Sequence, residues 1–223
     1  MRQSPEILAP AGSRQALTAA VQSGADAVYL GGPQFGARYS AENFTIEEMK
    51  TWVDYCHLYG VDVHVTVNTL VKEKEIESLK EYLKQLNKIG VDALIVQDMG
   101  AVEIIKKTVP DMTLHASTQM TVTSLEGVKY LEDMGFSRVV LARELSEKEI
   151  EHICKNAKAE IEVFVHGAIC MCYSGQCLMS SILGGRSGNR GRCAQPCRLP
   201  YDLLENGKTV KSGYVLSPKD MAL

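Results

Sequence analysis

The sequence predicts an α/β fold of the (β/α)8 TIM-barrel-like class, incomplete because only seven strands are found. A unit of glycine, spacer, aspartate and short apolar run recurs at residues 24–31, 60–68 and 90–98, with a degenerate copy at 135–144. The apolar runs are β-branched and do not alternate cleanly with polar residues, which is typical of parallel strands buried on both faces. No Gly-rich dinucleotide fingerprint follows the first strand, so the repeats favour a barrel over an open doubly wound sheet.

Helices are expected before the repeated glycines, at residues 46–58 and 73–89. In the second of these, Leu79, Leu83 and Leu86 recur at helical spacing, with Glu and Lys on the other face. A glycine follows each helix, where it fits a left-handed C-cap. Six of the seven strands are therefore separated from the next by a helix, which implies parallel strands with right-handed crossovers. The remaining strands are expected at residues 6–9, 113–119 and 161–166.

The chain after the barrel repeats has a different character. Asn206-Gly207 between two apolar stretches predicts a β-hairpin, because this dipeptide suits a two-residue hairpin turn. No eighth strand of the barrel type is found, so we expect this chain to be a fragment of a longer protein. We divide it into barrel repeats (1–169), a cysteine- and arginine-rich loop (170–198), and a hairpin that starts a further segment (199–223).

Composition limits the functional classes. The 223 residues are 45% hydrophobic and carry a net charge of −3, which is ordinary for a globular domain and excludes a polycation. No apolar run approaches the roughly 20 residues of a membrane span. The first residues contain no signal-peptide hydrophobic region, so a cytoplasmic location without membrane contact is expected. In such a reducing compartment, clustered cysteines favour metal binding or catalysis over disulfides.

Five of the seven cysteines lie in one loop: Cys170, Cys172, Cys177, Cys193 and Cys197. Structural cysteines scatter through a core, whereas thiolates gathered in one loop suit a soft metal or an iron–sulfur cluster. The spacings are C-x6-C, C-x15-C and C-x3-C, and only the last resembles a zinc knuckle. The spacing therefore favours an iron–sulfur cluster slightly over a zinc ion as the role of these cysteines. A disulfide ranks third and free thiols rank last.

Polar residues mark the carboxyl ends of the expected strands, where barrel enzymes carry their chemistry. The functional interpretation competes with a satisfied polar network that closes the barrel mouth. Glu162 and His166 lie four apart on one expected strand and so share a face. The polar set comprises Asn68, Gln97, Asp98, His115, Ser117, Gln119, Arg143, Glu144 and His166.

Four arginines and no acidic residue lie between residues 186 and 201: Arg186, Arg190, Arg192 and Arg198. Such a basic stretch suits a phosphate backbone or an acidic small substrate. A solvated loop with arginines packed on carbonyl groups explains the same pattern equally well.

The chain resembles the peptidase U32 family. The resemblance rests on EVFVHGAICMCYSGQCLMS (162–180), RSGNRGRCAQPCRLPY (186–201) and EILAPAG (6–12), together with GADAVYLGG and LHASTQM, and covers essentially the whole chain. It implies a TIM-type barrel, usually in a longer protein. It also implies hydroxylation of a pyrimidine C5 in tRNA or rRNA, with prephenate as a hydroxyl source. The cysteines that match the family's iron–sulfur ligands are Cys170, Cys177, Cys193 and Cys197, with Cys172 as an extra.

The leading hypothesis is an iron–sulfur enzyme for prephenate-dependent tRNA uridine 5-hydroxylation, with tRNA or rRNA and a second U32-family subunit as partners. A [4Fe–4S] cluster, or alternatively zinc, would occupy the four matching cysteines. One alternative is a collagenase-like peptidase that uses a metal or a Cys170–His166 pair, although no nucleophile elbow, HExxH motif or triad is evident. Another is a non-catalytic zinc scaffold. The catalytic candidates are His115, Gln119, Arg143, Glu144 and His166, and the substrate-binding candidates are Asn68, Gln97, Arg186, Arg190 and Arg198.

Overall fold

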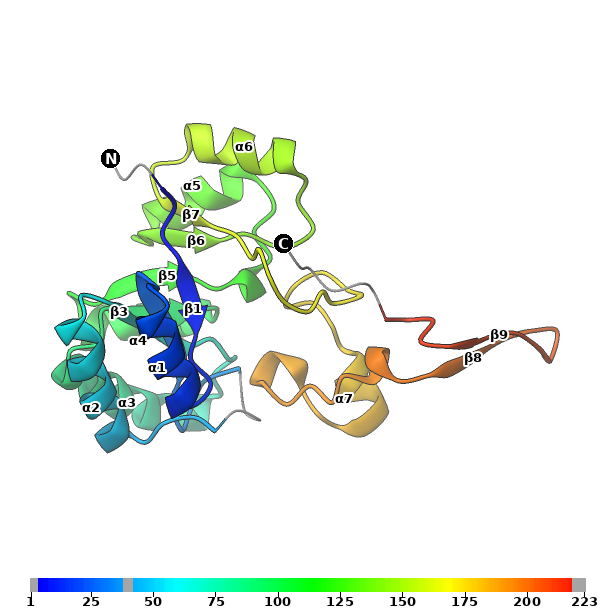
Figure 1. Ribbon diagram of the computed structural model, residues 1–223, viewed down its shortest axis with the longest axis horizontal. Coiled ribbons are helices and arrows are strands. Elements are labelled where there is room, and N and C mark those ends of the chain that lie inside the picture. Colours follow the sequence, from blue (N-terminus) through cyan, green and yellow to red (C-terminus); the bar gives the residue numbers. More distant parts are fainter. Residues whose placement is uncertain (1–3, 38–41, 218–223) are drawn as a thin grey trace.

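The expected parallel strands form one curled sheet with helices on its outer side (Figure 1). The structure is a computed structural model that describes residues 4–37 and 42–217. The seven strands pair in chain order from β1 to β7, and every pair is parallel. Within the described residues no strand pairs β7 with β1, so the sheet curls into a half-barrel that stays open along one seam.

The elements alternate along the chain as predicted. The strands of the sheet are β1 (Leu8–Pro10), β2 (Ala27–Gly31), β3 (Asp62–Val67), β4 (Ala93–Val96), β5 (Thr113–Ala116), β6 (Arg138–Val140) and β7 (Glu160–Glu162). The helices between them are α1 (Arg14–Gln22), α2 (Ile46–Leu58), α3 (Ile76–Ile89), α4 (Met99–Thr108), α5 (Leu125–Asp133) and α6 (Glu147–Asn156). After the sheet come α7 (Met179–Gly184) and a separate hairpin of β8 (Tyr201–Glu205) and β9 (Lys208–Gly213).

The local signals account for most boundaries. α2 has the expected bounds, and Thr45 begins it with a capping box that Glu48 completes. Gly90 ends α3 with φ of 84°, the left-handed C-cap that the repeated glycines predict. In the hairpin turn, Asn206 and Gly207 both have positive φ, as a type I′ turn requires.

Two strands are shorter than predicted. The expected strand at 113–119 ends as β5 at Ala116, and a 3-10 turn follows at Thr118–Met120. The expected strand at 161–166 ends as β7 at Glu162, because its neighbour β6 ends at Val140 and offers no further ladder partner. The last ladder contact is donated by the Leu141 N–H to the Glu162 carbonyl, at 3.0 Å. Residues 163–166 therefore leave the sheet as a connection toward the cysteine-rich loop, and the expectation that Glu162 and His166 share a strand face is wrong.

The hydrophobic core lies between the helices and the outer face of the sheet. Leu79, Leu83 and Leu86 of α3 are completely buried there, as their spacing predicts. Each such side chain contributes about 2 kcal/mol of burial free energy. Val63 and Val65 of β3 are equally buried on the strand side of this layer. No helix in the described part of the chain is long and apolar enough to cross a membrane.

The open seam is bridged by a single arginine of β6. Arg138 donates two hydrogen bonds to Glu6, which precedes β1, at 2.7 and 2.9 Å. The same guanidinium donates to Glu160 of β7 at 2.6 and 2.9 Å. Its side chain is only 10% exposed, so these bonds form with little competition from water. Arg138 therefore connects the first and last strands of the sheet through side chains.

The cysteine loop (residues 170–198) lies against the carboxyl ends of the strands, and two glycines permit the close approach. Gly175 has φ of +79°, and a Cβ there would lie 2.2 Å from the Gln119 carbonyl oxygen. Gly191 has φ of +73°, and a Cβ there would lie 2.6 Å from the carbonyl carbon of Ala37. Both positions need the left-handed region and the missing side chain, so glycine is required twice.

We predict that Arg138→Met lowers the free energy of unfolding by about 3 kcal/mol, because the change leaves partly buried carboxylates without their cation. Urea denaturation at pH 7 measures this loss. The control is Arg14→Met, which removes an exposed pair with Glu48 and should cost less than about 1 kcal/mol. Equal losses in the two variants would contradict the bridging role of Arg138.

We predict that Gly175→Ala loosens the cysteine loop, since the added Cβ collides with the backbone at Gln119. Trypsin should then cleave at the loop arginines about tenfold faster than in the wild type, as expected for an opening made about 1.4 kcal/mol easier. Gly207→Ala is the matched control, because Gly207 also has positive φ but meets nothing within 4 Å. Equal cleavage rates in both variants would contradict the prediction, because backbone strain at a positive φ would then explain the faster cleavage without the collision at Gln119.

Candidate active site at the barrel mouth

The cysteine loop is held together by bonds between its two halves. Arg198, which follows Cys197, donates a hydrogen bond to the carbonyl of Ile169, which precedes Cys170, at 2.8 Å. The buried hydroxyl of Ser180 accepts a bond from the Ala194 N–H at 2.9 Å. These contacts bring the sequence around the last two cysteines back to the start of the loop.

Three of the clustered cysteines act electrostatically on a fourth, Cys170. Burial is the largest cause that raises the pKa of the Cys170 thiol, and Cys197, Cys177 and Cys193 raise it further. Arg143 acts in the opposite direction, because its positive charge favours the thiolate. Cys170, Cys177, Cys193 and Cys197 are the four cysteines predicted as ligands, and the last three act on the first; their role as ligands stays a prediction. In the described ranges, no three His, Cys, Asp or Glu side chains form a group that could hold a single metal ion.

Two adjoining cavities lie between this cluster and the barrel interior. The outer one, which we call the mouth cavity, has a volume of about 240 Å³ and includes Arg143, Cys170 and Ser174 in its wall. The inner one, which we call the inner recess, has a volume of about 60 Å³ and extends toward Glu162. The two cavities share part of their wall. The residues that border both are Tyr29, Thr66, Asn68, Thr118 and Phe164.

Arg143 is the cation in the described part of the lining of the mouth cavity. Its guanidinium carbon lies 4.1 Å from the centre of the Phe164 ring, a cation–π contact, and its Nη1 donates to the Ala168 carbonyl at 2.8 Å. Its Nε is buried without a hydrogen-bond partner. Gln119 also borders this cavity, and its buried Oε1 has no partner either. A buried polar atom without a partner is costly, which marks both groups as candidate ligand contacts.

Several other predicted site residues use their polar groups to dock the loop or the strand ends. Gln97 and Arg190 contact the loop or its neighbours, Glu144 accepts from the loop backbone, and Asn68 holds the segment after β2. These hydrogen bonds satisfy the polar groups and also fix the position of the loop. The bonds are Gln97 to the Asn189 carbonyl (3.2 Å), Arg190 to Glu75 (2.6 and 3.1 Å), the Ser174 N–H to Glu144 (3.2 Å) and the Ala37 N–H to Asn68 (2.9 Å).

Most predicted site residues lie outside the two cavities; besides those that dock the loop, they include His115, His166 and Arg186. His115 is buried inside the barrel, where its ring meets that of His64 edge-on at 4.6 Å, and burial lowers its pKa to about 3. His166 is exposed and forms no hydrogen bond with Cys170 within the described residues, so the peptidase pair gains no support. Arg186 is exposed on the cysteine loop.

Sequence reasoning singled out the strand ends and missed parts of the strand interiors. Tyr29 and Thr66 lie within β2 and β3 and Phe164 follows β7; all three line both cavities and were not among the candidates. Glu162 lines the inner recess and belongs to the same group. A polar residue within an otherwise apolar strand was the available signal, because a fully buried strand has no solvent face to receive it.

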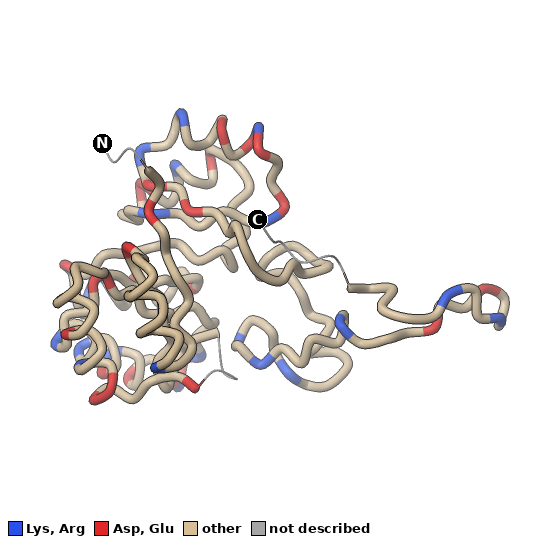
Figure 2. Tube along the Cα trace, in the orientation of Figure 1, with Lys and Arg blue, Asp and Glu red and all other residues tan. Residues whose placement is uncertain are grey.

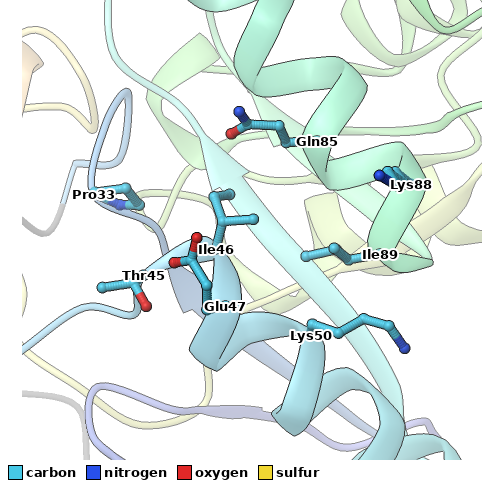
Figure 3. A pocket seen from close by; sticks show the side chains of 8 residues that line it. All are labelled: Pro33, Thr45, Ile46, Glu47, Lys50, Gln85, Lys88 and Ile89. Carbon is cyan, nitrogen blue, oxygen red and sulfur yellow. The ribbon is translucent and has the colours of Figure 1, made fainter.

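A larger groove lies on the outer surface of the barrel. It has a volume of about 520 Å³ and opens between α2 and α3 (Figure 3). The Lys50 ammonium on its rim is paired with Asp54 at 2.6 Å. No cysteine is among the described residues that border this groove, so we place the candidate site at the mouth cavity. Its lining residues are Pro33, Thr45, Ile46, Glu47, Lys50, Gln85, Lys88 and Ile89.

Comparison with known proteins identifies the relatives of this chain. The 23S rRNA 5-hydroxycytidine C2501 synthase of Escherichia coli (strain K12) is 45% identical over 217 residues, which cover 96% of this chain and 33% of that protein. The tRNA hydroxylation protein P1 of Bacillus subtilis (strain 168) is 40% identical over 227 residues, which cover 98% of this chain and 54% of that protein. The chain thus spans a third to about half of the length of these relatives.

The fold has a solved counterpart. The structure of the U32 peptidase Mk0906 matches with a TM-score of 0.61 and 20% identity, over 75% of this chain and 72% of that one. The family model described as peptidase family U32 matches residues 12–223. The matched segment includes the barrel repeats from α1 onward and the whole cysteine loop. With this match and relatives of 40% identity or more, the chain belongs to peptidase family U32.

Proposed function

We propose that this chain is the iron–sulfur part of an RNA hydroxylase, acting in prephenate-dependent 5-hydroxylation of uridine in tRNA. The observation that carries the proposal is that Cys177, Cys193 and Cys197 all act electrostatically on Cys170, which lies with Arg143 in the wall of the mouth cavity. The names of two relatives support RNA as the target, since one is a 5-hydroxycytidine synthase for 23S rRNA and the other a tRNA hydroxylation protein.

Cys170, Cys177, Cys193 and Cys197 would hold a [4Fe–4S] cluster. The donor set fits, because four thiolates are the usual ligands of such a cluster. The positive charge of Arg143 favours the thiolate form of Cys170, which is the form that binds metal. When bound, the cluster would supply electrons or a Lewis-acid site next to the mouth cavity.

Arg143 would bind the carboxylate of a small acid in the mouth cavity, and prephenate is the acid we propose. A guanidinium forks onto a carboxylate through two parallel N–H groups, and the Nε of Arg143 has no partner among the described residues. The Phe164 ring and the Ala168 carbonyl hold the guanidinium in place. Gln119, whose Oε1 is also unpartnered, would accept a hydrogen bond from the ligand or the base.

The basic side of the cysteine loop would receive the RNA backbone. Figure 2 shows blue segments without red ones around α7, consistent with the four arginines between residues 186 and 201. Arg186 and Arg192 are exposed there. Contacts between arginines and phosphates position a nucleic acid without reading its sequence. We infer that this surface orients the RNA, while the target base enters the mouth cavity.

We predict that wild-type protein purified without oxygen contains about four irons and four labile sulfides per chain, with the broad absorption of a [4Fe–4S] cluster. Cys177→Ser should lose most of the iron and, in cells, the hydroxylation of the target RNA measured by mass spectrometry. Cys154→Ser is the matched control, because Cys154 is an exposed cysteine on α6. One zinc per wild-type chain, or full RNA hydroxylation in a colourless Cys177→Ser protein, would refute the proposal. Hydroxylated cytidine in rRNA in place of uridine in tRNA would correct the target only.

We predict that Arg143→Lys weakens prephenate binding by about 10- to 100-fold, since hydrogen bonds to a charged group contribute about 1.5–3 kcal/mol and lysine cannot fork. Isothermal titration calorimetry measures the change. Arg14→Lys serves as the control, because Arg14 pairs with Glu48 on the outer surface. Wild-type affinity in Arg143→Lys would exclude Arg143 as the carboxylate ligand.

A further inference from the structure

Glu162 is the carboxyl group in the wall of the inner recess. It ends β7, and its side chain is 20% exposed. Its Oε2 atom is buried and has no hydrogen-bond partner. The other polar groups that border the recess are the uncharged side chains of Tyr29, Thr66, Asn68, Ser117 and Thr118. No cysteine lines this recess, so the group lies apart from the proposed cluster ligands.

The neighbouring arginine is engaged elsewhere. Arg138 donates four hydrogen bonds to Glu6 and Glu160. Its Nη1 lies 3.7 Å from Oε2 of Glu162, which is too long for a hydrogen bond. Three carboxyl groups therefore face one guanidinium, and the contact with Glu162 is the longest of the three.

Among the described residues, the remaining neighbours of Glu162 supply no compensating positive charge. His64 and His115 lie in the same barrel interior, and burial lowers their pKa values to about 4 and about 3, so both are neutral at pH 7. Burial raises the pKa of Glu162 to about 7, with Glu6 and Glu160 acting in the same direction and Arg138 against it. The carboxyl group is consequently protonated in a large share of molecules at neutral pH.

The size of the recess restricts what can reach Glu162. Its volume is about 60 Å³, and a water molecule takes roughly 30 Å³ of liquid volume. A hydroxyl, carbonyl or carboxyl group fits this space, whereas a nucleobase or a six-membered ring does not. Because the recess and the mouth cavity share five lining residues, one ligand can extend from Arg143 to Glu162.

We propose that protonated Glu162 donates a hydrogen bond to an oxygen at the inner end of the small acid that occupies the mouth cavity. This inference rests on the proposed function, which places such an acid there. It assigns a ligand class: a carboxylic acid held by Arg143 at one end, with a hydroxyl, carbonyl or second carboxyl oxygen at the other. For a carbonyl or carboxylate oxygen, which can only accept, an ionised Glu162 offers no donor and repels the oxygen, so binding of such an acid depends on pH.

The test measures the affinity of prephenate between pH 6.5 and 8.5 by isothermal titration calorimetry. Ligand binding is full below the pKa of Glu162 and is lost as the pH rises above it. With a pKa of about 7, the dissociation constant of the wild type should increase about 20-fold over this range. Glu162→Gln should bind with nearly constant affinity, because the amide donates a hydrogen bond at every pH.

A second variant and a spectroscopic readout complete the test. Glu160→Gln removes a neighbouring carboxylate, so the midpoint of the pH dependence should move to lower pH. Carbon-13 NMR of labelled glutamate should show one carboxyl resonance that titrates near pH 7 in the wild type and is missing in Glu162→Gln. Unchanged pH dependence in Glu162→Gln would overturn this inference alone. Absence of prephenate binding by the wild type at pH 6.5 would overturn both the proposed co-substrate and this inference.

Discussion

The ion-pair network of Arg138 is the interaction on which the geometry of the site depends. In the described sheet, no backbone ladder joins β7 to β1. The guanidinium of Arg138 connects Glu6 to Glu160 across that seam. β7 is held to the rest of the sheet on one side only, through three residue pairs with β6. Since β7 carries Glu162 and leads into Phe164 and the cysteine loop, its position sets the positions of all three. The network also explains why a charged group is tolerated in a barrel interior, because its N–H groups are all directed at carboxylates.

The polar residues at the barrel mouth divide into two functions. Gln97, Glu144 and Arg190 form hydrogen bonds that hold the cysteine loop or its surroundings, so their polar groups are satisfied within the protein. Arg143 and Gln119 retain buried atoms without partners and face the mouth cavity. Docking and ligand binding thus use neighbouring strand ends. The docking bonds make the cavity rigid, which lowers the entropic cost of binding a ligand in it.

The backbone of the cysteine loop packs closely on the barrel, and the charge of Arg143 acts on the thiol of Cys170 in this loop. Gly175 and Gly191 allow the loop backbone to lie directly on the barrel, which puts Cys170 in the wall of the mouth cavity. The same approach places Cys170 near Arg143, whose charge opposes the effect of burial on the thiol. A cluster bound at these cysteines would therefore adjoin the bound acid. The loop belongs to the part of the chain that the family model covers, together with nearly the whole barrel.

The sequence by itself determined the repeated β-α order, the position of α2 and the hairpin turn, because periodicity, capping residues and turn residues are local properties. The four candidate ligands came from the resemblance to a family, and their role stays a prediction. The sequence did not determine which polar residues border a cavity. His115 and Gln119 looked alike as strand-end residues, yet one is enclosed in the barrel and the other faces the mouth cavity. The sequence also could not show that Arg138 meets Glu6, 132 residues away, or that Glu162 remains without a full partner. Those properties depend on the curvature of the sheet, which brings distant side chains into one low-dielectric interior and so decides their charge states.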